Sequence, residues 1–315
     1  MSRRYIFSSR RNEKRFPFVD EGTRQPYSFA ERFSNGRHAT RSVVDFHNYT
    51  IPAPLFWNMD DIARLAEQVR DAETVVAFTG AGTSTASGIP DFRSDSGIWT
   101  QFDEADFHYR RFRTDPAAFW TDRLDLHETM FGGEVEPNEA HDALAELAAN
   151  GQLDAIVTQN TDGLHAESLN GHADGQDATE LVELHGNAHR VVCESCGRTA
   201  DAAPVRERVR SGELPPRCTD CDGLLKPDVV LFGERLDEGT LRRARQFARR
   251  ADVFIAIGSS LTVEPAASLP RTATRNGATT AIVNFDRTPF SPRATFDVRG
   301  DVTTVLPELR ARVVT

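Results

Sequence analysis

Residues 74–88 read TVVAFTGAGTSTASG. The first five, Thr74–Phe78, are apolar and mostly β-branched, which predicts a short strand buried in a parallel sheet. Gly80 and Gly82 then allow the chain to turn sharply and to approach a phosphate closely, and a helix N-terminus after the turn would offer amide donors. Because Thr85 stands where the dinucleotide-binding motif has its third glycine, the spacing alone leaves an ordinary strand-to-helix turn open.

Strands and helices alternate along the rest of the chain. Short β-rich runs predict strands, and amphipathic runs predict helices: strands at 155–158, 253–257 and 280–284, and helices at 138–149 and 238–250. Asn138 is a plausible cap at the start of the first helix, and Gly151 lies beyond its end. This order predicts an α/β fold with a doubly wound, parallel, Rossmann-like sheet.

All four cysteines lie in one short part of the chain, as the pairs Cys193-x-x-Cys196 and Cys218-x-x-Cys221. Two disulfides are possible, but in a chain of this length with no signal peptide the spacing favours a tetrahedral zinc site. Four thiolates leave no open position for water, so we expect one structural zinc ion. We assign residues 191–224 to a small inserted zinc-binding module, and residues 59–190 and 225–315 to the nucleotide-binding domain.

Residues 1–58 differ from the remainder. They are rich in Arg, Ser and Phe, show no sustained periodicity, and carry a net charge of +5, against −15 for the rest of the chain. We expect this segment to be a disordered or non-native extension, with Met59 as a natural start because helical patterning begins there. Only two lysines occur, Lys14 and Lys226, and this acidic, lysine-poor composition indicates a salt-rich cytoplasm or a coding bias for arginine.

Composition also excludes some classes of function. The acidic body argues against strong direct binding to nucleic-acid phosphates. The chain has no apolar run long enough to span a bilayer and no secretory signal, so we expect a cytoplasmic protein with no membrane partner. The oligomeric state is left open.

Polar residues follow three of the predicted strands. In a doubly wound fold these strand ends lie at one sheet edge, where ligands bind, so a single polar ligand spanning them is expected. The clusters are Gln159, Asn160 and Asp162; Gly258, Ser259 and Ser260; and Asn284, Phe285 and Asp286. After the glycine turn, Arg93 is able to hold a phosphate and Phe92 to cover a flat heterocycle, although core packing is the commoner role for such a phenylalanine.

Taken together, these motifs resemble those of the sirtuins, NAD-dependent protein deacylases. The resemblance rests on Gly80-Ala81-Gly82-x-Ser84, Ile89-Pro90-Asp91-Phe92-Arg93, Thr158-Gln159-Asn160-x-Asp162, Leu184-His185-Gly186, the four cysteines, Val229-Val230-x-Phe232-Gly233-Glu234 and Gly258-Ser259-Ser260-Leu261. They occur in the family's order across about residues 60–310. Residues 1–58 lie outside the resemblance.

The resemblance implies a reaction between NAD and an acylated lysine. The acyl oxygen attacks C1′ of the nicotinamide ribose, nicotinamide leaves, and a base then activates a ribose hydroxyl, giving free lysine and O-acyl-ADP-ribose. His185 is the candidate base, since an imidazole with a pKa near about 6.5 suits that task. We expect His165, the nearest rival, to be a packing residue, and His141 and His189 have no motif support.

The resemblance also implies roles for the remaining site residues. Catalysis is assigned to His185 and Asn160, with Gln159 and Asn160 orienting the ribose and Asp162 holding the carboxamide. The NAD-binding set is Gly80, Ala81, Gly82, Ser84, Asp91, Phe92, Arg93, Gln159, Asn160, Asp162, Gly258, Ser259, Ser260, Asn284, Phe285, Asp286 and Val302. The acyl-lysine peptide is expected at Val230, Phe232, Gly233 and Glu234, where a strand from Val229 to Glu234 would pair with it; a plain buried strand is the alternative.

The sequence also bears on the choice of acyl group and on the alternative functions. The succinyl-removing branch of the family carries a Tyr-x-x-Arg pair, but Phe112 stands three residues after Tyr109, so we favour acetyl or another uncharged acyl group. Mono-ADP-ribosyl transfer to protein is the alternative activity, and a non-catalytic NAD- and zinc-binding interaction module is the alternative without chemistry. An NAD dehydrogenase is disfavoured because no strict dinucleotide motif is present.

Overall fold

A computed structural model describes residues 59–92, 97–172 and 179–314, which all lie in one compact unit of the chain. The predicted extension at residues 1–58 therefore lies outside the described residues and stays a prediction. Among the described helices, none is both long and apolar enough to cross a membrane. The cytoplasmic location also stays a prediction.

The larger sheet has six parallel strands in the order β3-β2-β1-β7-β8-β9. The strands are β1 (Val75–Thr79), β2 (Ala155–Thr158), β3 (Glu180–Glu183), β7 (Val253–Ile257), β8 (Thr279–Asn284) and β9 (Phe296–Arg299). This order, with its reversal at β1, confirms the doubly wound fold. The four strands predicted from the sequence are present and begin within one residue of the expected positions.

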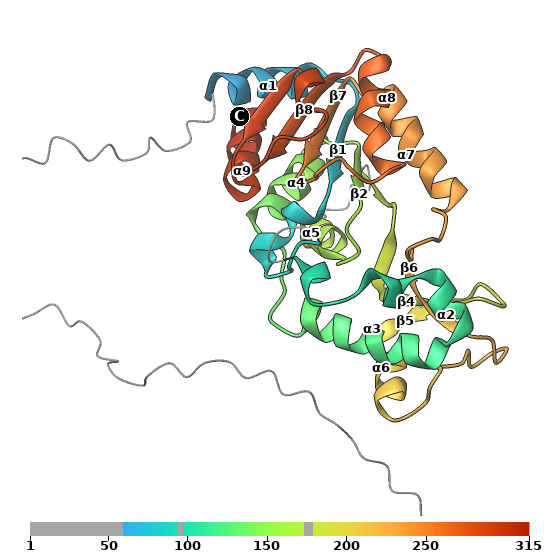
Figure 1. Ribbon diagram of the computed structural model, residues 1–315. Helices are drawn as coiled ribbons and strands as arrows, with labels where there is room; N and C mark the ends of the chain where they lie inside the picture. Colours follow the sequence, from blue (N-terminus) through green and yellow to red (C-terminus); the bar gives the residue numbers. More distant parts are fainter. Residues whose placement is uncertain (1–58, 93–96, 173–178, 315) are drawn as a thin grey trace, which may run out of the picture. The chain divides into compact units, whose positions relative to one another are not determined.

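Helices cover both faces of this sheet (Figure 1). Alternate residues of β1 face opposite ways, so Val75 and Ala77 join one core while Val76 and Phe78 join the other. The first core contains α1 (Met59–Asp71), α4 (Glu139–Ala149) and α9 (Val302–Val313), beside which lies α5 (Leu164–His172); the second contains α7 (Glu238–Arg250) and α8 (Leu269–Arg275). The predicted helices at 138–149 and 238–250 are thus confirmed as α4 and α7.

Local signals explain the ends of α4. The side chain of Asn138 accepts a hydrogen bond from the amide of Ala140, and the imidazole of His141 accepts one from the amide of Asn138, so the two cap the helix reciprocally. Gly151, beyond the end, has a φ of +70°, which favours glycine. The predicted cap is confirmed, and His141 has a structural role.

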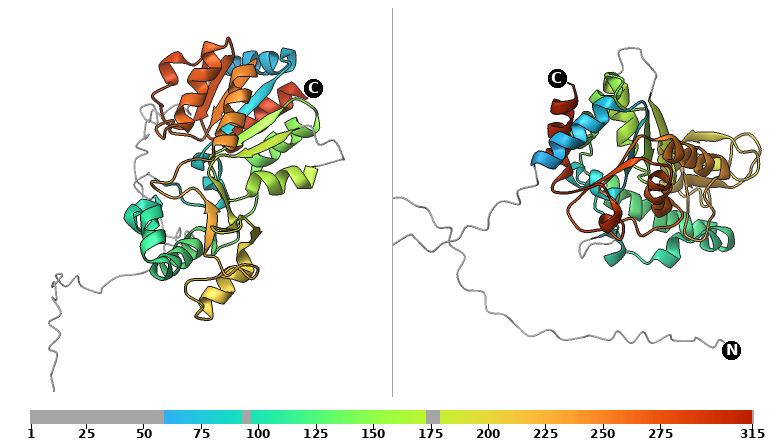
Figure 2. Two further views of the ribbon diagram at one scale, coloured as in Figure 1. Left: turned by 90° about the vertical axis from the view of Figure 1, so that its right-hand side faces the viewer. Right: turned by 90° about the horizontal axis from the view of Figure 1, so that it is seen from above.

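A smaller subdomain is built around a three-stranded antiparallel sheet, β5-β4-β6 (Figure 2). Its elements are β4 (Gly186–Cys193), β5 (Thr199–Asp201), β6 (Leu225–Val229), α2 (Tyr109–Thr114), α3 (Pro116–Phe131) and α6 (Ala202–Arg210). Phe119 and Trp120 of α3 share one core with Val191 of β4 and Val209 of α6. The subdomain is therefore wider than the predicted module at 191–224: its sheet spans 186–229, and two of its helices come from 109–131.

The remaining regular elements are short 3₁₀ helices. They are η1 (Ala81–Thr83), η2 (Thr85–Ser87), η3 (Ile98–Thr100), η4 (Glu104–Phe107), η5 (Ala266–Ser268) and η6 (Ser291–Arg293). The glycine turn after β1 leads into η1 and η2, not into the α-helix that the sequence suggested. The amide donors expected from a helix N-terminus are thus replaced by those of two tight single turns.

Candidate active site

A cleft of about 570 Å³ opens at the carboxyl ends of β1, β2, β7 and β8 and continues along the segment after β6. This volume is typical of small-molecule sites, and the position is where doubly wound sheets bind ligands. The predicted residues that line it are Gly80, Ala81, Gly82, Asp91, Phe92, Gln159, Asn160, His185, Val230, Phe232, Gly233, Glu234, Gly258, Ser259, Ser260, Asn284, Phe285 and Asp286. The structure thus brings most of the predicted site into one cleft.

The glycines of the first turn are required by close packing against the loop after β7. A Cβ on Gly80 or Gly82 would lie 2.8 or 2.9 Å from the carbonyl oxygen of Gly258. The amide of Gly82 already donates to that oxygen at 2.8 Å. Gly258 itself has a φ of +57°, and a Cβ there would lie 2.4 Å from the amide nitrogen of Thr83. Two loops far apart in sequence are therefore held in contact at the floor of the cleft.

Gln159 and Asn160 extend this contact to β2. The amide group of Gln159 donates to the Ser259 hydroxyl at 2.9 Å. The amide group of Asn160 donates to the carbonyl oxygen of Gly80 and to the hydroxyl of Ser84, both at 3.1 Å. Side-chain positions on a wall formed by three strand ends are therefore fixed by hydrogen bonds before any ligand binds.

Ser84 and Asp162 lie behind this wall and do not line the cleft. Both are buried, and the Ser84 hydroxyl donates to the Asp162 carboxylate at 2.8 Å. The other carboxylate oxygen accepts from the amide of Leu164 at 3.0 Å, at the start of α5. Asp162 is thus tied to Asn160 through one shared hydroxyl.

His185 stands between β3 and β4, where the two sheets of the unit meet in sequence. Its Nδ1 lies 2.9 Å from the carbonyl oxygen of Gln159. A carbonyl only accepts, so Nδ1 carries a proton, and the neutral form of the ring then has its lone pair on Nε2. The backbone carbonyl of His185 accepts from the amide of Val230 at 2.9 Å, which fixes the imidazole beside both the Gln159–Asn160 wall and the segment after β6.

The predicted strand from Val229 to Glu234 is corrected by the structure. β6 ends at Val229, and the segment that follows makes only an isolated bridge, between Phe232 and His108. Gly233 has a φ of +73°, and a Cβ there would overlap the His108 ring, so the chain turns at this point. The carboxylate of Glu234 closes the turn by accepting from the amide of Leu231 at 2.9 Å.

Lys226 anchors this turn and was not identified from the sequence. Its ammonium group is buried and donates to the carbonyl oxygens of Pro227 and Val229, at 3.1 and 2.8 Å. It also lies 3.2 Å from the carboxylate of Glu234. Lys226 is one of only two lysines in the chain, and this rarity is the only feature of the sequence that could have singled it out.

The remaining wall of the cleft is largely aromatic and aliphatic, and the sequence predicted only part of it. The rings of Phe92 and Trp99 stack at 5.8 Å, and Trp99 meets Phe232 edge-on at 5.2 Å. The cleft-lining residues that sequence reasoning missed are Thr85, Trp99, Phe107, Arg123, Leu126, Met130, Thr161, Val229, Leu231, Leu236, Val263, Glu264 and Arg287. Leu126 and Met130 are four apart on α3, so helical periodicity marks them as one face without indicating what they face.

Besides Ser84 and Asp162, two further predicted NAD contacts do not line the cleft. Val302 is the first residue of α9 and is buried in the first core with Val305 and Leu306, so it does not reach the cleft. Arg93 lies outside the described residues.

Two other histidines near the site, His165 and His189, have structural roles. His165 is buried, with Nε2 2.9 Å from the Thr79 hydroxyl, and its ring lies 4.7 Å from that of His141. Burial and the neighbouring His141 hold the pKa of His165 well below its ordinary range. The expectation that His165 is a packing residue is confirmed. His189 lies with Nε2 2.8 Å from the carbonyl oxygen of Asp162 and supports the wall from behind.

The four cysteines converge at the far end of the smaller subdomain. Their sulfur atoms all lie within 4.8 Å of one another, with 3.5 Å between Cys193 and Cys221 and 3.9 Å between Cys196 and Cys218. A tetrahedral zinc ion with Zn–S bonds of about 2.3 Å places its ligands about 3.8 Å apart, so the cluster fits one zinc ion. The predicted set of ligands is confirmed, and none of the four lines the cleft.

The sequence of residues 80–265 matches the Sir2 family. The chain belongs to the Sir2 family. Its relatives include the NAD-dependent protein deacetylase of Haloarcula marismortui, 51% identical over 251 residues that cover 79% of this chain and 93% of the relative. The NAD-dependent protein deacetylase of Sulfolobus acidocaldarius is 39% identical, with coverages of 81% and 96%.

Solved Sir2 structures share the fold. One described as the structural basis for the mechanism and regulation of Sir2 enzymes superposes with a TM-score of 0.69 at 37% identity, covering 81% of this chain and 98% of the other. The crystal structure of a Sir2 homologue–NAD complex gives a TM-score of 0.67 at 35% identity, with coverages of 80% and 93%. The resemblance to the sirtuins and the predicted fold class are thereby confirmed.

Proposed function

We propose that this protein is an NAD-dependent protein-lysine deacylase that yields nicotinamide, free lysine and O-acyl-ADP-ribose. The observation that carries the proposal is the position of His185, whose imidazole lines the same cleft as the glycine turn, Asn160 and the segment after β6. A module that only binds NAD has no need of a base at this point. The relatives named as NAD-dependent deacetylases, at up to 51% identity, support the same activity.

His185 acts as the general base in this proposal. The hydrogen bond from Nδ1 to the carbonyl of Gln159 selects the tautomer whose Nε2 accepts a proton from a ribose hydroxyl. Base catalysis of this type contributes about 10²–10⁴-fold to the rate. Gln159 supplies both this carbonyl and, through its side chain, a bond to Ser259, so one residue positions the base and the opposite loop.

NAD is the co-substrate, and it supplies the ribose carbon at which nicotinamide is displaced. The glycine turn and Ser259–Ser260 offer a small-residue floor for its phosphates and ribose, and Asn284–Asp286 border its adenosine end. Asn160 orients the nicotinamide ribose. Asp162 keeps its predicted role toward the carboxamide as part of the proposal: although it lies behind Asn160, a carboxylate has about four acceptor positions and the structure fills two. Arg93 keeps its predicted phosphate contact as part of the proposal.

The acylated lysine of a protein substrate is the second reactant. Its backbone is proposed to lie beside Val230, Phe232, Gly233 and Glu234, in the segment that follows β6. The apolar wall of Phe107, Leu126 and Met130 suits an uncharged acyl chain. The absence of a Tyr-x-x-Arg pair supports the same preference.

The zinc ion is proposed to be structural, because the four thiolates complete its coordination. It would stabilise the loops at the end of the smaller subdomain, whose core carries α3 and, with it, one wall of the cleft.

The experiment incubates the protein with an acetyl-lysine peptide and NAD labelled in the adenylate phosphate. We expect the label in O-acetyl-ADP-ribose, and none there when the same peptide carries unmodified lysine. Label attached to protein in place of this product would overturn the proposal in favour of mono-ADP-ribosyl transfer. NAD binding without any turnover would favour the non-catalytic interaction module.

A further inference from the structure

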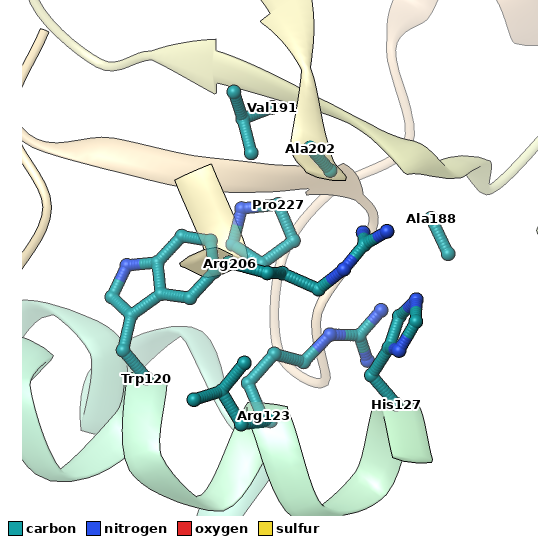
Figure 3. Close-up of a pocket in the computed structure, with 9 residues that line it drawn as sticks. Trp120, Arg123, His127, Ala188, Val191, Ala202, Arg206 and Pro227 are labelled. Carbon is teal, nitrogen blue, oxygen red and sulfur yellow. The ribbon is translucent and has the colours of Figure 1, made fainter. Parts of the chain in front are cut away.

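A second, much smaller cavity lies inside the smaller subdomain, between α3, α6 and strands β4 and β6 (Figure 3). Its walls include Trp120, Arg123 and His127 from α3, Arg206 from α6 and Pro227 from β6. The cavity volume is about 10 Å³, the space that one water-sized particle occupies. The indole of Trp120 is fixed by a hydrogen bond to the carbonyl oxygen of Leu225, so this wall is rigidly placed.

Three nitrogen-bearing side chains converge on this cavity. Figure 3 shows the guanidinium groups of Arg123 and Arg206, from facing helices, lying close together beside the imidazole of His127. Arg123 and His127 are one helical turn apart on α3, whereas Arg206 reaches the same point from the opposite wall. Two positive charges are therefore gathered at one small space.

Among the described residues no carboxylate is bonded to the cluster, although the charges of Asp201 and Glu128 act on Arg206 and favour its charged form. Within the described residues, neither Arg123 nor Arg206 makes an ion pair or a hydrogen bond, and both ring nitrogens of His127 are buried without a partner. The nearby Glu128 is engaged by Arg210 on the surface. Other arginines of the subdomain, such as Arg190 and Arg208, are paired with carboxylates.

Burial and the crowding of positive groups lower the pKa values of Arg123 and His127. Burial and the charge of Arg206 lower the pKa of Arg123 to about 10. Burial and the two arginines lower the pKa of His127 to about 4. Both shifts follow from burial and from neighbouring positive groups, with Glu128 opposing the shift of His127. Buried positive charge that no bonded partner neutralises is costly in a folded protein.

We propose that this cavity binds a small monovalent anion of the size of chloride, held by Arg123, His127 and Arg206. The small volume favours one small spherical ion over a tetrahedral oxyanion such as phosphate. A water molecule fits the space but leaves both charges uncompensated. A salt-rich cytoplasm, one of the two explanations of the lysine-poor, acidic composition, would supply an abundant inorganic anion to such a site.

The bound anion would connect the two halves of the subdomain. It bridges α3 to α6, and α3 carries Leu126 and Met130 on the wall of the large cleft. Arg123 lines both cavities, so an anion that holds its guanidinium also fixes its position beside the cleft. The site is thus a stabilising element next to the substrate wall.

The test measures thermal unfolding of the full-length protein in potassium chloride and in potassium gluconate at equal ionic strength, since gluconate is too large for the cavity. We expect chloride alone to raise the Tm, by roughly 3–6 °C for each tenfold increase above its dissociation constant. Equal Tm values in the two salts across the whole range would overturn the proposal.

Two variants on the same helix separate a specific site from a general salt effect. Arg206→Gln should lose the chloride-specific shift and, in gluconate, should melt no lower than the wild type because a like-charge contact is relieved. Arg208→Gln, which removes a guanidinium paired with Glu213, should keep the shift. An unchanged chloride response in Arg206→Gln would contradict the proposal.

A direct measurement covers the case in which a variant fails to fold. Crystals of the wild-type protein grown in potassium bromide should show an anomalous scattering peak between the guanidinium groups of Arg123 and Arg206. A well-defined cavity without that peak would overturn the assignment.

Discussion

The edge of the large sheet and the cavity beside α3 both gather polar side chains, but only the first gives each a partner. Asn160, Ser84 and Asp162 form a chain of hydrogen bonds that is in place without a ligand. Arg123 and Arg206 face each other without an ion pair or hydrogen bond among the described residues. The hydrogen-bonded network fixes side-chain positions around the proposed substrate, whereas the unpaired guanidinium groups are the basis of the proposed anion site.

Because zinc is proposed to stabilise the smaller subdomain, removing the metal should give the largest effect on the cavity side of this comparison. We expect Cys193→Ala to lose zinc and to unfold the cysteine loops, since zinc binding contributes about 10–16 kcal/mol in isolated zinc peptides. Metal content and circular dichroism measure this, and Ser195→Ala, an exposed neighbour, is the matched control. A Cys193→Ala protein with native stability and zinc content but no activity would give the metal a chemical role.

The hydrogen-bonded network of the cleft should be intolerant of deletion. Asn160→Ala removes both donors to Gly80 and Ser84, and we expect kcat to fall by about 10²-fold or more, as when a preorganised donor is lost. Steady-state kinetics with an acetyl-lysine peptide measures the loss, and Asn276→Ala on the exposed end of α8 is the control. A change confined to the KM for NAD would reduce Asn160 to a binding residue.

Most of the large sheet was predictable because its strands are short apolar runs buried on both faces, as at Val253–Ile257. The zinc ligands were predictable because two C-x-x-C pairs have the spacing that a tetrahedral zinc site requires. The extent of the smaller subdomain was not, since α2 and α3 join it only through tertiary contacts of residues such as Trp120.

The candidate site, like the fold, was predicted from the sequence only in part. Polar residues at strand ends were found because the fold class places those ends together. The end of β6 at Val229 was missed because the apolar run continues to Phe232, and the turn is set by packing of Gly233 on His108. Val302 was misplaced because its helix is held by the core, and the cation cluster was missed because Arg206 is remote in sequence from Arg123.

Lys226 offers a third buried cation that sharpens the comparison. It has three oxygen acceptors, so its removal should destabilise the protein where Arg206→Gln does not. We expect Lys226→Met to cost roughly 2–3 kcal/mol, below the value for fully buried pairs because Glu234 is partly exposed. Urea unfolding measures this, together with a raised KM for the peptide. Equal effects of the two substitutions would remove the distinction between paired and unpaired cations.

The smallest expected effect is the pH dependence of stability through His127. Its pKa is lowered to about 4, by burial and by Arg206 on α6 and Arg123 on α3, with His189 on β4 adding to the shift and Glu128 opposing it. The unfolded chain, which titrates near about 6.5, then binds more protons, so stability falls as pH drops from that value towards 4 and is unaffected at higher pH. His127→Gln should make this acid-side slope shallower than in the wild type.

Histidines elsewhere provide the background for that measurement. Burial also lowers the pKa of His141 and His165, so part of the acid-side loss should persist in the His127 variant. Chloride should flatten the wild-type slope, because an anion beside His127 favours its charged form. An identical slope in wild type and His127→Gln would show that the cluster does not perturb this imidazole.

The most direct test of the account is nicotinamide release from NAD by wild type and His185→Ala, with and without an acetyl-lysine peptide, at low and at molar salt. We expect release to require the peptide and His185→Ala, folded as the wild type, to turn over about 10²–10⁴-fold more slowly. His172→Ala, at the end of α5, should leave the rate unchanged. Undiminished turnover by His185→Ala would contradict the central claim that this imidazole is the base.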